Sequence, residues 1–171
     1  MSTPTQLNEP GQMKPGQMKP AHIEPALSRR EEMSVSGAAM SQAPWTGAAV
    51  TGGVVALGDF GWHVIGGHFG RGGISDALSL GVIAFLVVAA SGALLRERSG
   101  RAIRWARTNP WRFALLPGVA AAAIVFVLSV VLGGGIVGPV FAGLWHGAVA
   151  FGLTGAVGSY ARSRANRRPS A

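Results

Sequence analysis

Asp59 and His63 are the side chains whose types and spacing most clearly offer chemistry. They lie four residues apart in the stretch GDFGWHVIGGHFG, and this spacing places both on one face of a helix. A carboxylate beside an imidazole can pass a proton or contribute ligands to a metal ion. His146 lies in another apolar stretch, and we expect it at a depth comparable with that of Asp59. We therefore treat Asp59, His63 and His146 as a candidate polar cluster.

Four interpretations of this cluster are open. In the first, the three side chains bond to each other and to the backbone and fix the register of the helices, as polar groups do in membrane bundles. In the second, they form a proton or ion pathway. In the third, His63, His68 and His146 are weak candidates for metal ligands with Asp59, although no recognised ligand motif is present. In the fourth, His63 and His146 hold a haem. Of these interpretations we favour the ones without a ligand, so we expect neither a metal nor a cofactor.

The composition indicates that these residues belong to an integral membrane protein. Of the 171 residues, 49% are hydrophobic and only 13% are charged, about half the usual charged fraction of soluble domains. The arginines cluster at the ends of apolar runs and not along one helix face, so we expect no nucleic-acid partner. Cysteine is absent, and the chain lacks HExxH, a phosphate loop and a nucleophile elbow, so we expect that it is not an enzyme.

Four apolar runs are long enough to cross the hydrocarbon core, which takes about 20 residues. The sequence predicts an all-α integral membrane protein whose four transmembrane helices form two helical hairpins. The run from 113 to 161 contains no charge, and the GGGIVGP segment divides it into two spans. The transmembrane domain covers residues 44–161, with spans at about 45–66, 77–95, 113–132 and 136–160.

The positive charges orient these spans. Six arginines lie between the second and third spans and four more in the basic tail, residues 162–171, whereas the first outer connection carries only Arg71. We therefore expect a multi-pass protein of the cell (plasma) membrane with both termini in the cytoplasm. Residues 1–43, with proline at every fifth position from Pro10 to Pro25, are predicted to form a disordered cytoplasmic tail.

The basic inner loop also predicts a partner. Its segment RAIRWARTNPWR, which begins at Arg101, is typical of an amphipathic helix that lies on the cytoplasmic leaflet. Arginines beside Trp105 would contact anionic lipid headgroups there. The lipid bilayer is therefore the first expected partner, and a homo-oligomer or another membrane protein is the second.

Small residues mark the faces along which membrane helices approach each other. Gly143 and Gly147 form such a pair in the fourth span, and Gly52 shares the helix face of Asp59 and His63. We therefore expect the polar pair to face a helix or a cavity and not lipid.

The two halves of the chain also resemble each other and predict a parallel internal repeat. Residues 43–56 align with residues 109–122 through a shared Pro-Trp, and the segment from Ala90 aligns with that from Leu153.

These features favour a small membrane protein with a structural or partner-binding role. The alternative is a subunit of a proton- or ion-coupled transporter or channel that uses Asp59 and His63 with His146. A bundle of four helices is small for a whole transporter, so this second function would favour a homo-oligomer.

Overall fold

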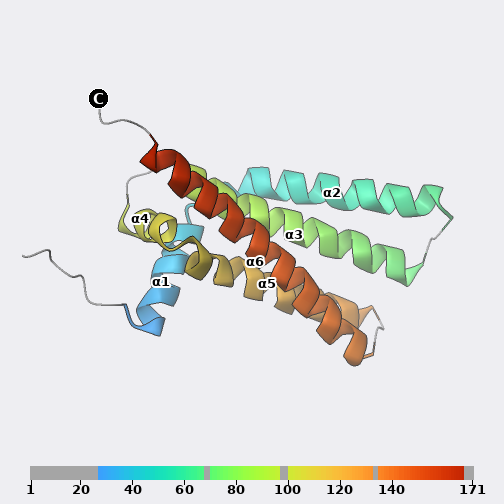
Figure 1. The fold of residues 1–171 in the computed structure, drawn as a ribbon. Helices are drawn as coiled ribbons and strands as arrows, with labels where there is room; N and C mark the ends of the chain where they lie inside the picture. The colour runs from blue at the N-terminus through green and yellow to red at the C-terminus, as the bar shows by residue number, and fades with distance from the viewer. Residues whose placement is uncertain (1–26, 68–69, 97–99, 133–134, 168–171) are drawn as a thin grey trace, which may run out of the picture.

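The computed structural model describes residues 27–67, 70–96, 100–132 and 135–167, without the side chains of 165 and 166. The chain is helical throughout these ranges, apart from short turns (Figure 1). The helices are α1 (Arg29–Met40), α2 (Trp45–Ile65), α3 (Arg71–Leu95), α4 (Arg101–Thr108), α5 (Pro110–Val131) and α6 (Val137–Asn166). This confirms the all-helical prediction.

Four of these helices are long and apolar enough to cross a membrane, as predicted. α2, α3 and α5 contain 21, 25 and 22 residues, and α6 contains 30. Three of them extend beyond the predicted spans: α3 begins at Arg71 and α5 at Pro110, each before its charge-free run, and α6 continues to Asn166. A helix continues through charged residues where its end lies outside the hydrocarbon, so the charge-free run is shorter than the helix.

Helix α1 corrects the expectation of a disordered tail over residues 1–43. Residues 1–26 lie outside the described residues, but 29–40 form a helix. Ser28 and Glu31 form a capping box, in which the Ser28 backbone N–H donates to the Glu31 carboxylate at 2.8 Å. The Glu31 backbone N–H donates in return to the Ser28 hydroxyl at 3.4 Å. α1 also buries Ala39 and Met40 in the core, so local capping and tertiary packing together order this segment.

Helix α4 confirms that residues in the basic inner loop form an amphipathic helix. Ile103 and Ala106 are buried, whereas Arg101 and Arg104 are exposed. Arg107 fixes the helix to the end of α3, because its guanidinium group donates to the carbonyl oxygens of Leu94 and Arg96. α1 and α4 both lie at the same end of the long helices (Figure 1).

Helix α3 is the centre of the packing. It contacts α2, α5 and α6, whereas α2 packs, among the described elements, against α3 alone. Ile83 and Leu86 of α3 form one buried cluster with Ala121 of α5 and Ala150 of α6. A second cluster lies nearer α1 and α4 and includes Phe113, which is fully buried.

Glycines allow the long helices to approach closely, as predicted. A Cβ atom at Gly52 would lie only 2.8 Å from the carbonyl oxygen of Gly81 in α3. A Cβ atom at Gly147 would lie 2.7 Å from Cβ of Ala122 in α5, and one at Gly143 would lie 2.8 Å from the carbonyl oxygen of Ala122. All three contacts are too short for any side chain, so these glycines determine the distance between the helix axes.

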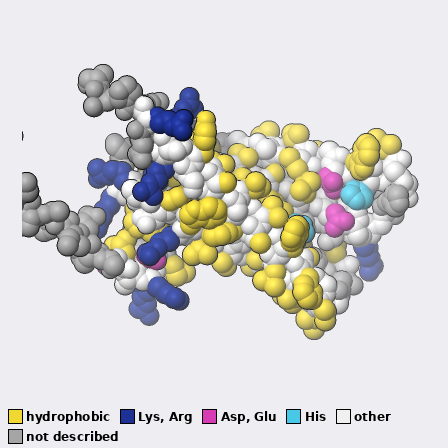
Figure 2. All heavy atoms as spheres, in the orientation of Figure 1, with side chains coloured by type: hydrophobic (Ala, Val, Ile, Leu, Met, Phe, Trp, Pro, Cys, Tyr) yellow, Lys and Arg dark blue, Asp and Glu magenta, His cyan; other side chains and the backbone are white. Residues whose placement is uncertain are grey.

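The positively charged side chains gather mostly at one end of the bundle (Figure 2). We call the end that carries α1 and α4 the basic end, and the end that carries the α2–α3 and α5–α6 connections the glycine end. The described arginines at the basic end come from the α1 region, the α3–α5 connection and the last turns of α6: Arg29, Arg30, Arg96, Arg101, Arg104, Arg107, Arg112, Arg162, Arg164 and Arg167. Arg71 is the one described arginine at the glycine end.

Candidate functional site

The predicted polar pair is formed within α2. The Nδ1 atom of His63 lies 2.9 Å from the backbone carbonyl oxygen of Asp59 and 3.3 Å from its Oδ2. Because a carbonyl oxygen can only accept a hydrogen bond, Nδ1 carries the hydrogen in this contact. In the neutral form of the ring, the other nitrogen, Nε2, has a lone pair that can accept a hydrogen bond.

Both side chains are largely withdrawn from the surface. The exposed fraction is 26% for His63 and 25% for Asp59. The Oδ2 atom of Asp59 is buried, and within the described part of the chain it accepts no hydrogen bond, because the Nδ1 hydrogen is directed at the carbonyl oxygen. A buried oxygen of this kind is costly unless it is protonated, paired or hydrated, and the His63 ring, 3.3 Å away, is a polar neighbour within α2.

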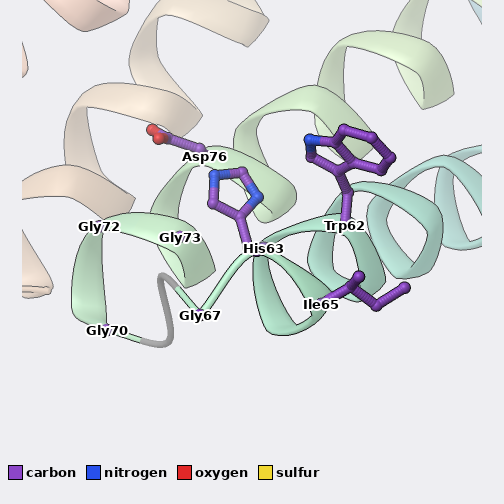
Figure 3. A pocket seen from close by; sticks show the side chains of 9 residues that line it. Trp62, His63, Ile65, Gly67, Gly70, Gly72, Gly73 and Asp76 are labelled. Carbon is purple, nitrogen blue, oxygen red and sulfur yellow. The ribbon is translucent and has the colours of Figure 1, made fainter.

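A recess of about 820 Å³ lies at the glycine end, between the last turn of α2 and the first turns of α3 (Figure 3). Trp62 and His63 line it from α2, and Asp76 lines it from α3. The remaining lining residues are Ile65, Gly66, Gly67, Gly70, Gly72 and Gly73. Gly67 has a φ of 70°, a conformation that favours glycine, so the turn after α2 depends on this residue. The recess gives His63 contact with the space outside the bundle.

His146 does not join the pair, which corrects the predicted cluster of three. Its Nδ1 atom donates to the carbonyl oxygen of Ala142, one turn earlier in α6, at 2.7 Å. α2 and α6 both pack on α3 but, over the described residues, not on each other. The sequence predicted similar depths for Asp59 and His146, but a depth does not determine which side of the bundle a residue faces.

The metal and haem interpretations gain no geometric support. Within the described ranges, no group of three His, Cys, Asp or Glu side chains is arranged to hold a metal ion. His63 and His146 each bond to a carbonyl oxygen of their own helix, and no contact between α2 and α6 brings the two together in the described residues. His68 lies outside the described residues.

Two polar features of the structure do not follow from the apolar runs and charges of the sequence. Asp76 directly precedes the apolar run 77–95, yet it lines the same recess as His63. The sequence did offer one indication of this placement: neighbouring spans run antiparallel, so the end of the first span and the start of the second lie at the same end of the bundle. Glu32 of α1 pairs with Arg112 of α5, 80 residues later, and no local pattern links the two.

Comparison of the chain with protein-family models, with curated proteins and with solved structures gives no match. Function is therefore inferred from the residues and contacts described above. The polar pair in α2, the recess at the glycine end and the basic end with α1 are the features that a function must explain.

Proposed function

We propose that this chain is a multi-pass integral membrane protein in which α2, α3, α5 and α6 cross the bilayer. The lengths and apolar character of these helices support the proposal. Their outward faces carry large apolar side chains that are well exposed, among them Val54, Leu57, Val119, Val131, Phe141 and Leu144. In water such a surface would drive aggregation, whereas lipid chains would cover it.

The charge separation supports an orientation in the plasma membrane with the basic end in the cytoplasm. Arginines gather at that end, whereas the glycine end carries Arg71 alone among the described arginines. Helix α1 and the last turns of α6 both lie at the basic end (Figure 1). Both termini would then be cytoplasmic.

Within the membrane we propose a non-enzymatic structural or partner-binding role. The observation that carries this proposal is that both histidines bond within their own helices: His63 donates back to the carbonyl oxygen of Asp59, and His146 makes the equivalent bond within α6. Each histidine is thus bonded to its own helix, and the two lie on helices that do not pack together. This arrangement suits polar groups that stabilise helices better than a relay that crosses the bundle.

A proton- or ion-coupled function is the second candidate, and one observation favours it. The buried Oδ2 of Asp59 lies 3.3 Å from Nδ1 of His63 without a hydrogen bond, and His63 lines an open recess with Asp76. A proton that entered the recess could reach the imidazole and then the carboxylate. A complete pathway would need further groups towards the basic end, or a second copy of the chain.

The isosteric substitution Asp59→Asn separates the two functions. The structural role predicts a loss of unfolding free energy of at most about 1.7 kcal/mol, the largest measured for a polar contact in a membrane bundle. The substitution keeps the bond from His63 to the backbone carbonyl and weakens only the 3.3 Å approach of Nδ1 to Oδ2, and proton flux should not change. Stability would be measured in mixed micelles, and flux in proteoliposomes that contain a pH-sensitive dye. His146→Gln is the matched control in α6. A folded Asp59→Asn protein that loses a flux present in the parent would refute the structural role.

We also propose that the two halves are a parallel repeat with an offset of 66 residues. Trp45 at the start of α2 packs against Phe85 of α3, with ring centroids 5.8 Å apart. Their counterparts 66 residues later, Trp111 and Phe151, pack in the same way at 5.4 Å. A common origin of the two α-hairpins would explain why the same contacts recur.

Close glycine contacts repeat at the same offset and support the proposal. They are the contacts of Gly81 with Ala56 and of Gly147 with Ala122, and those of Gly92 with Pro44 and of Gly158 with Pro110. Gly92 therefore corresponds to Gly158, and this register replaces the alignment that starts from Ala90 and Leu153.

The polar recess belongs to the first half only. At the 66-residue offset the counterparts of Asp59, His63 and Asp76 are Val125, Ser129 and Ala142. In this proposal the contacts that both halves share hold the helices of each hairpin together. The polar residues Asp59, His63 and Asp76, which the second half lacks, give the first hairpin its distinct role.

A further inference from the structure

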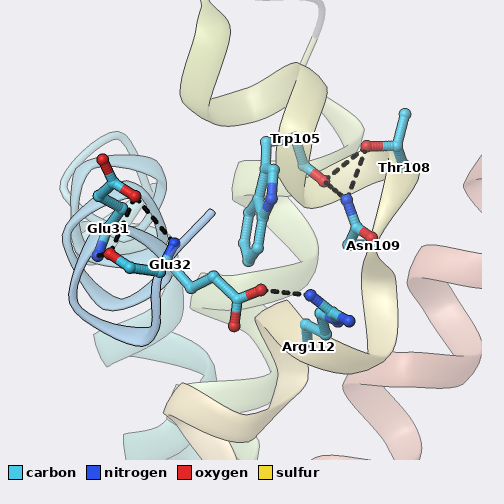
Figure 4. Close-up of polar contacts among 7 residues, drawn as sticks. Glu31, Glu32, Trp105, Thr108, Asn109 and Arg112 are labelled. Carbon is cyan, nitrogen blue, oxygen red and sulfur yellow. Dashed lines mark hydrogen bonds and ion pairs between the residues drawn. The ribbon is translucent and has the colours of Figure 1, made fainter. Parts of the chain in front are cut away.

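A groove at the basic end lies between α1 on one side and α4 and α5 on the other. Figure 4 shows Glu32 of α1 reaching towards Arg112 of α5. We call its polar part the arginine pocket, a space of about 970 Å³. The pocket is lined by Leu27, by Glu31, Glu32 and Val35 of α1, by Arg101, Arg104, Trp105 and Thr108 of α4, and by Asn109 and Arg112. Helices α1 and α4 thus bring acidic and basic side chains to one space beside the start of α5.

An adjoining apolar pocket of about 670 Å³ continues the groove along α5. Met33, Leu115, Leu116 and Val119 supply its apolar lining. Leu27, Glu32 and Arg112 line both pockets, so the two meet at the Glu32–Arg112 ion pair. Because Leu115 and Val119 follow Arg112 by one and two helical turns, the groove changes from basic to apolar along the axis of a predicted membrane span.

The carboxylates in the arginine pocket are already engaged. The Glu31 carboxylate accepts hydrogen bonds from the backbone N–H and the hydroxyl of Ser28. These bonds, and the more distant Arg101, hold the pKa of Glu31 below its ordinary value. Glu32 pairs with Arg112. Within the described chain, Arg101 and Arg104 have no carboxylate at ion-pair distance, so the arginine pocket has two guanidinium groups available to an anion. The adjoining pocket adds Arg29, which also lacks such a carboxylate among the described residues.

We propose that the groove binds one anionic phospholipid, with its phosphate on Arg101 and Arg104 and an acyl chain along Leu115 and Val119. The planar guanidinium group binds phosphate through paired hydrogen bonds. The order of the lining, arginine first and then leucine and valine, matches the order of phosphate and acyl chain in a phospholipid. This inference rests on the membrane insertion proposed above and assigns a particular site to the lipid contact expected of the basic loop.

The test is native mass spectrometry of the full-length protein, purified in detergent, with added phosphatidylglycerol or phosphatidylcholine. Detergent micelles lack a bilayer surface potential, so a bound lipid reports a site and not general attraction. The variant Arg101→Gln/Arg104→Gln removes the two available guanidinium groups of the arginine pocket. Arg164→Gln/Arg167→Gln is the matched control, because it removes two exposed arginines from the same end, outside the groove.

We expect one phosphatidylglycerol per chain, a weaker retention of phosphatidylcholine, and an affinity for phosphatidylglycerol at least about tenfold lower in the Arg101/Arg104 variant. The control should change by less than about threefold. An equal loss in both variants would refute the groove as the site. If the Gln variant does not fold, Arg101→Lys/Arg104→Lys replaces it, and an affinity equal to that of the parent would count against the proposal.

Soluble glycerol 3-phosphate distinguishes a lipid from a free phosphate. The proposal predicts that it displaces phosphatidylglycerol only at a concentration at least about a hundredfold higher, because it lacks the acyl chains that the apolar pocket would bury. Displacement at an equal concentration would identify a phosphate site and overturn the lipid assignment. Membrane insertion is tested separately by extraction of the protein from membranes, so failure of the insertion and failure of the lipid site give different results.

Discussion

Replacement of Gly52 by alanine tests how α2 is held on α3. The added Cβ would lie 2.8 Å from the carbonyl oxygen of Gly81 and 2.8 Å from Cβ of Phe85, whereas ordinary contacts begin at 3.4 Å. Neither of these atoms belongs to the flexible end of a side chain. The two helices would therefore have to separate by about half an ångström, and overpacking of this kind costs about 1–3 kcal/mol.

Gly53→Ala is the matched control in the same helix. A Cβ at Gly53 meets nothing within 4 Å, so this variant gains the higher helix propensity of alanine, up to about 1 kcal/mol, without the contact. Gly52→Ala has the same gain and the steric cost. We therefore expect Gly52→Ala to be less stable than Gly53→Ala by about 1–3 kcal/mol.

The assay is unfolding in mixed micelles with increasing sodium dodecyl sulfate, followed by circular dichroism and tryptophan fluorescence. Fluorescence is informative because Trp45 packs against Phe85 of α3, so separation of the helices alters its surroundings. Equal midpoints for Gly52→Ala and Gly53→Ala would refute the close crossing of α2 and α3. The placement of His63 of α2 and Asp76 of α3 at one recess would then lose its basis.

Three further predictions concern the basic end and the core. Glu31 has a lowered pKa because Ser28 donates to it, so its contribution to α1 is complete above the ordinary value of 4.5 and is lost as the pH falls below it. The protection of α1 against hydrogen exchange, corrected for the intrinsic exchange rate, should therefore fall in acid. Glu31→Gln should abolish this pH dependence, whereas Ser28→Ala should remove only part of it because the backbone N–H at position 28 still donates; a pH profile unchanged by Glu31→Gln would contradict the cap. Phe113→Ala should lower the unfolding free energy by about 3–5 kcal/mol because the side chain is fully buried, whereas Val119→Ala, on the exposed face of α5, should cost much less in the same micelle assay. Arg107→Gln should increase hydrogen exchange in α4 because it removes hydrogen bonds to carbonyl groups at the end of α3, and exchange equal to that of the parent would show that these bonds do not hold the helix.

The long helices could be predicted from the sequence because a membrane span requires one simple property, an apolar run of sufficient length. Contact faces could be predicted for a similar reason. Gly52 and Gly147 are small residues at helical spacing from other small residues, and both lie where helices touch. The local bond between His63 and Asp59 also follows from a spacing of four residues.

The remaining features depend on information that apolar runs and helical spacing do not contain. His146 has the expected depth but lies on α6, and only the packing of α2 and α6 on α3 shows that it is separate from Asp59. The ion pair of Glu32 with Arg112 joins residues far apart in the chain. The capping box of α1 was present as Ser28 and Glu31, but the proline-rich segment before it favoured the prediction of a disordered tail.

Site-directed labelling tests the central claim, a four-span bundle with its basic end in the cytoplasm, most directly. The chain has no cysteine, so single cysteines can be introduced without a background. Ser34→Cys and Ser163→Cys place an exposed thiol at the basic end, and Gly72→Cys and Ile136→Cys place one at the glycine end. A membrane-impermeant maleimide applied to intact cells should label only the two glycine-end positions, and all four after permeabilisation. Labelling of Ser34→Cys in intact cells, or opposite accessibility of Gly72→Cys and Ile136→Cys, would contradict the account.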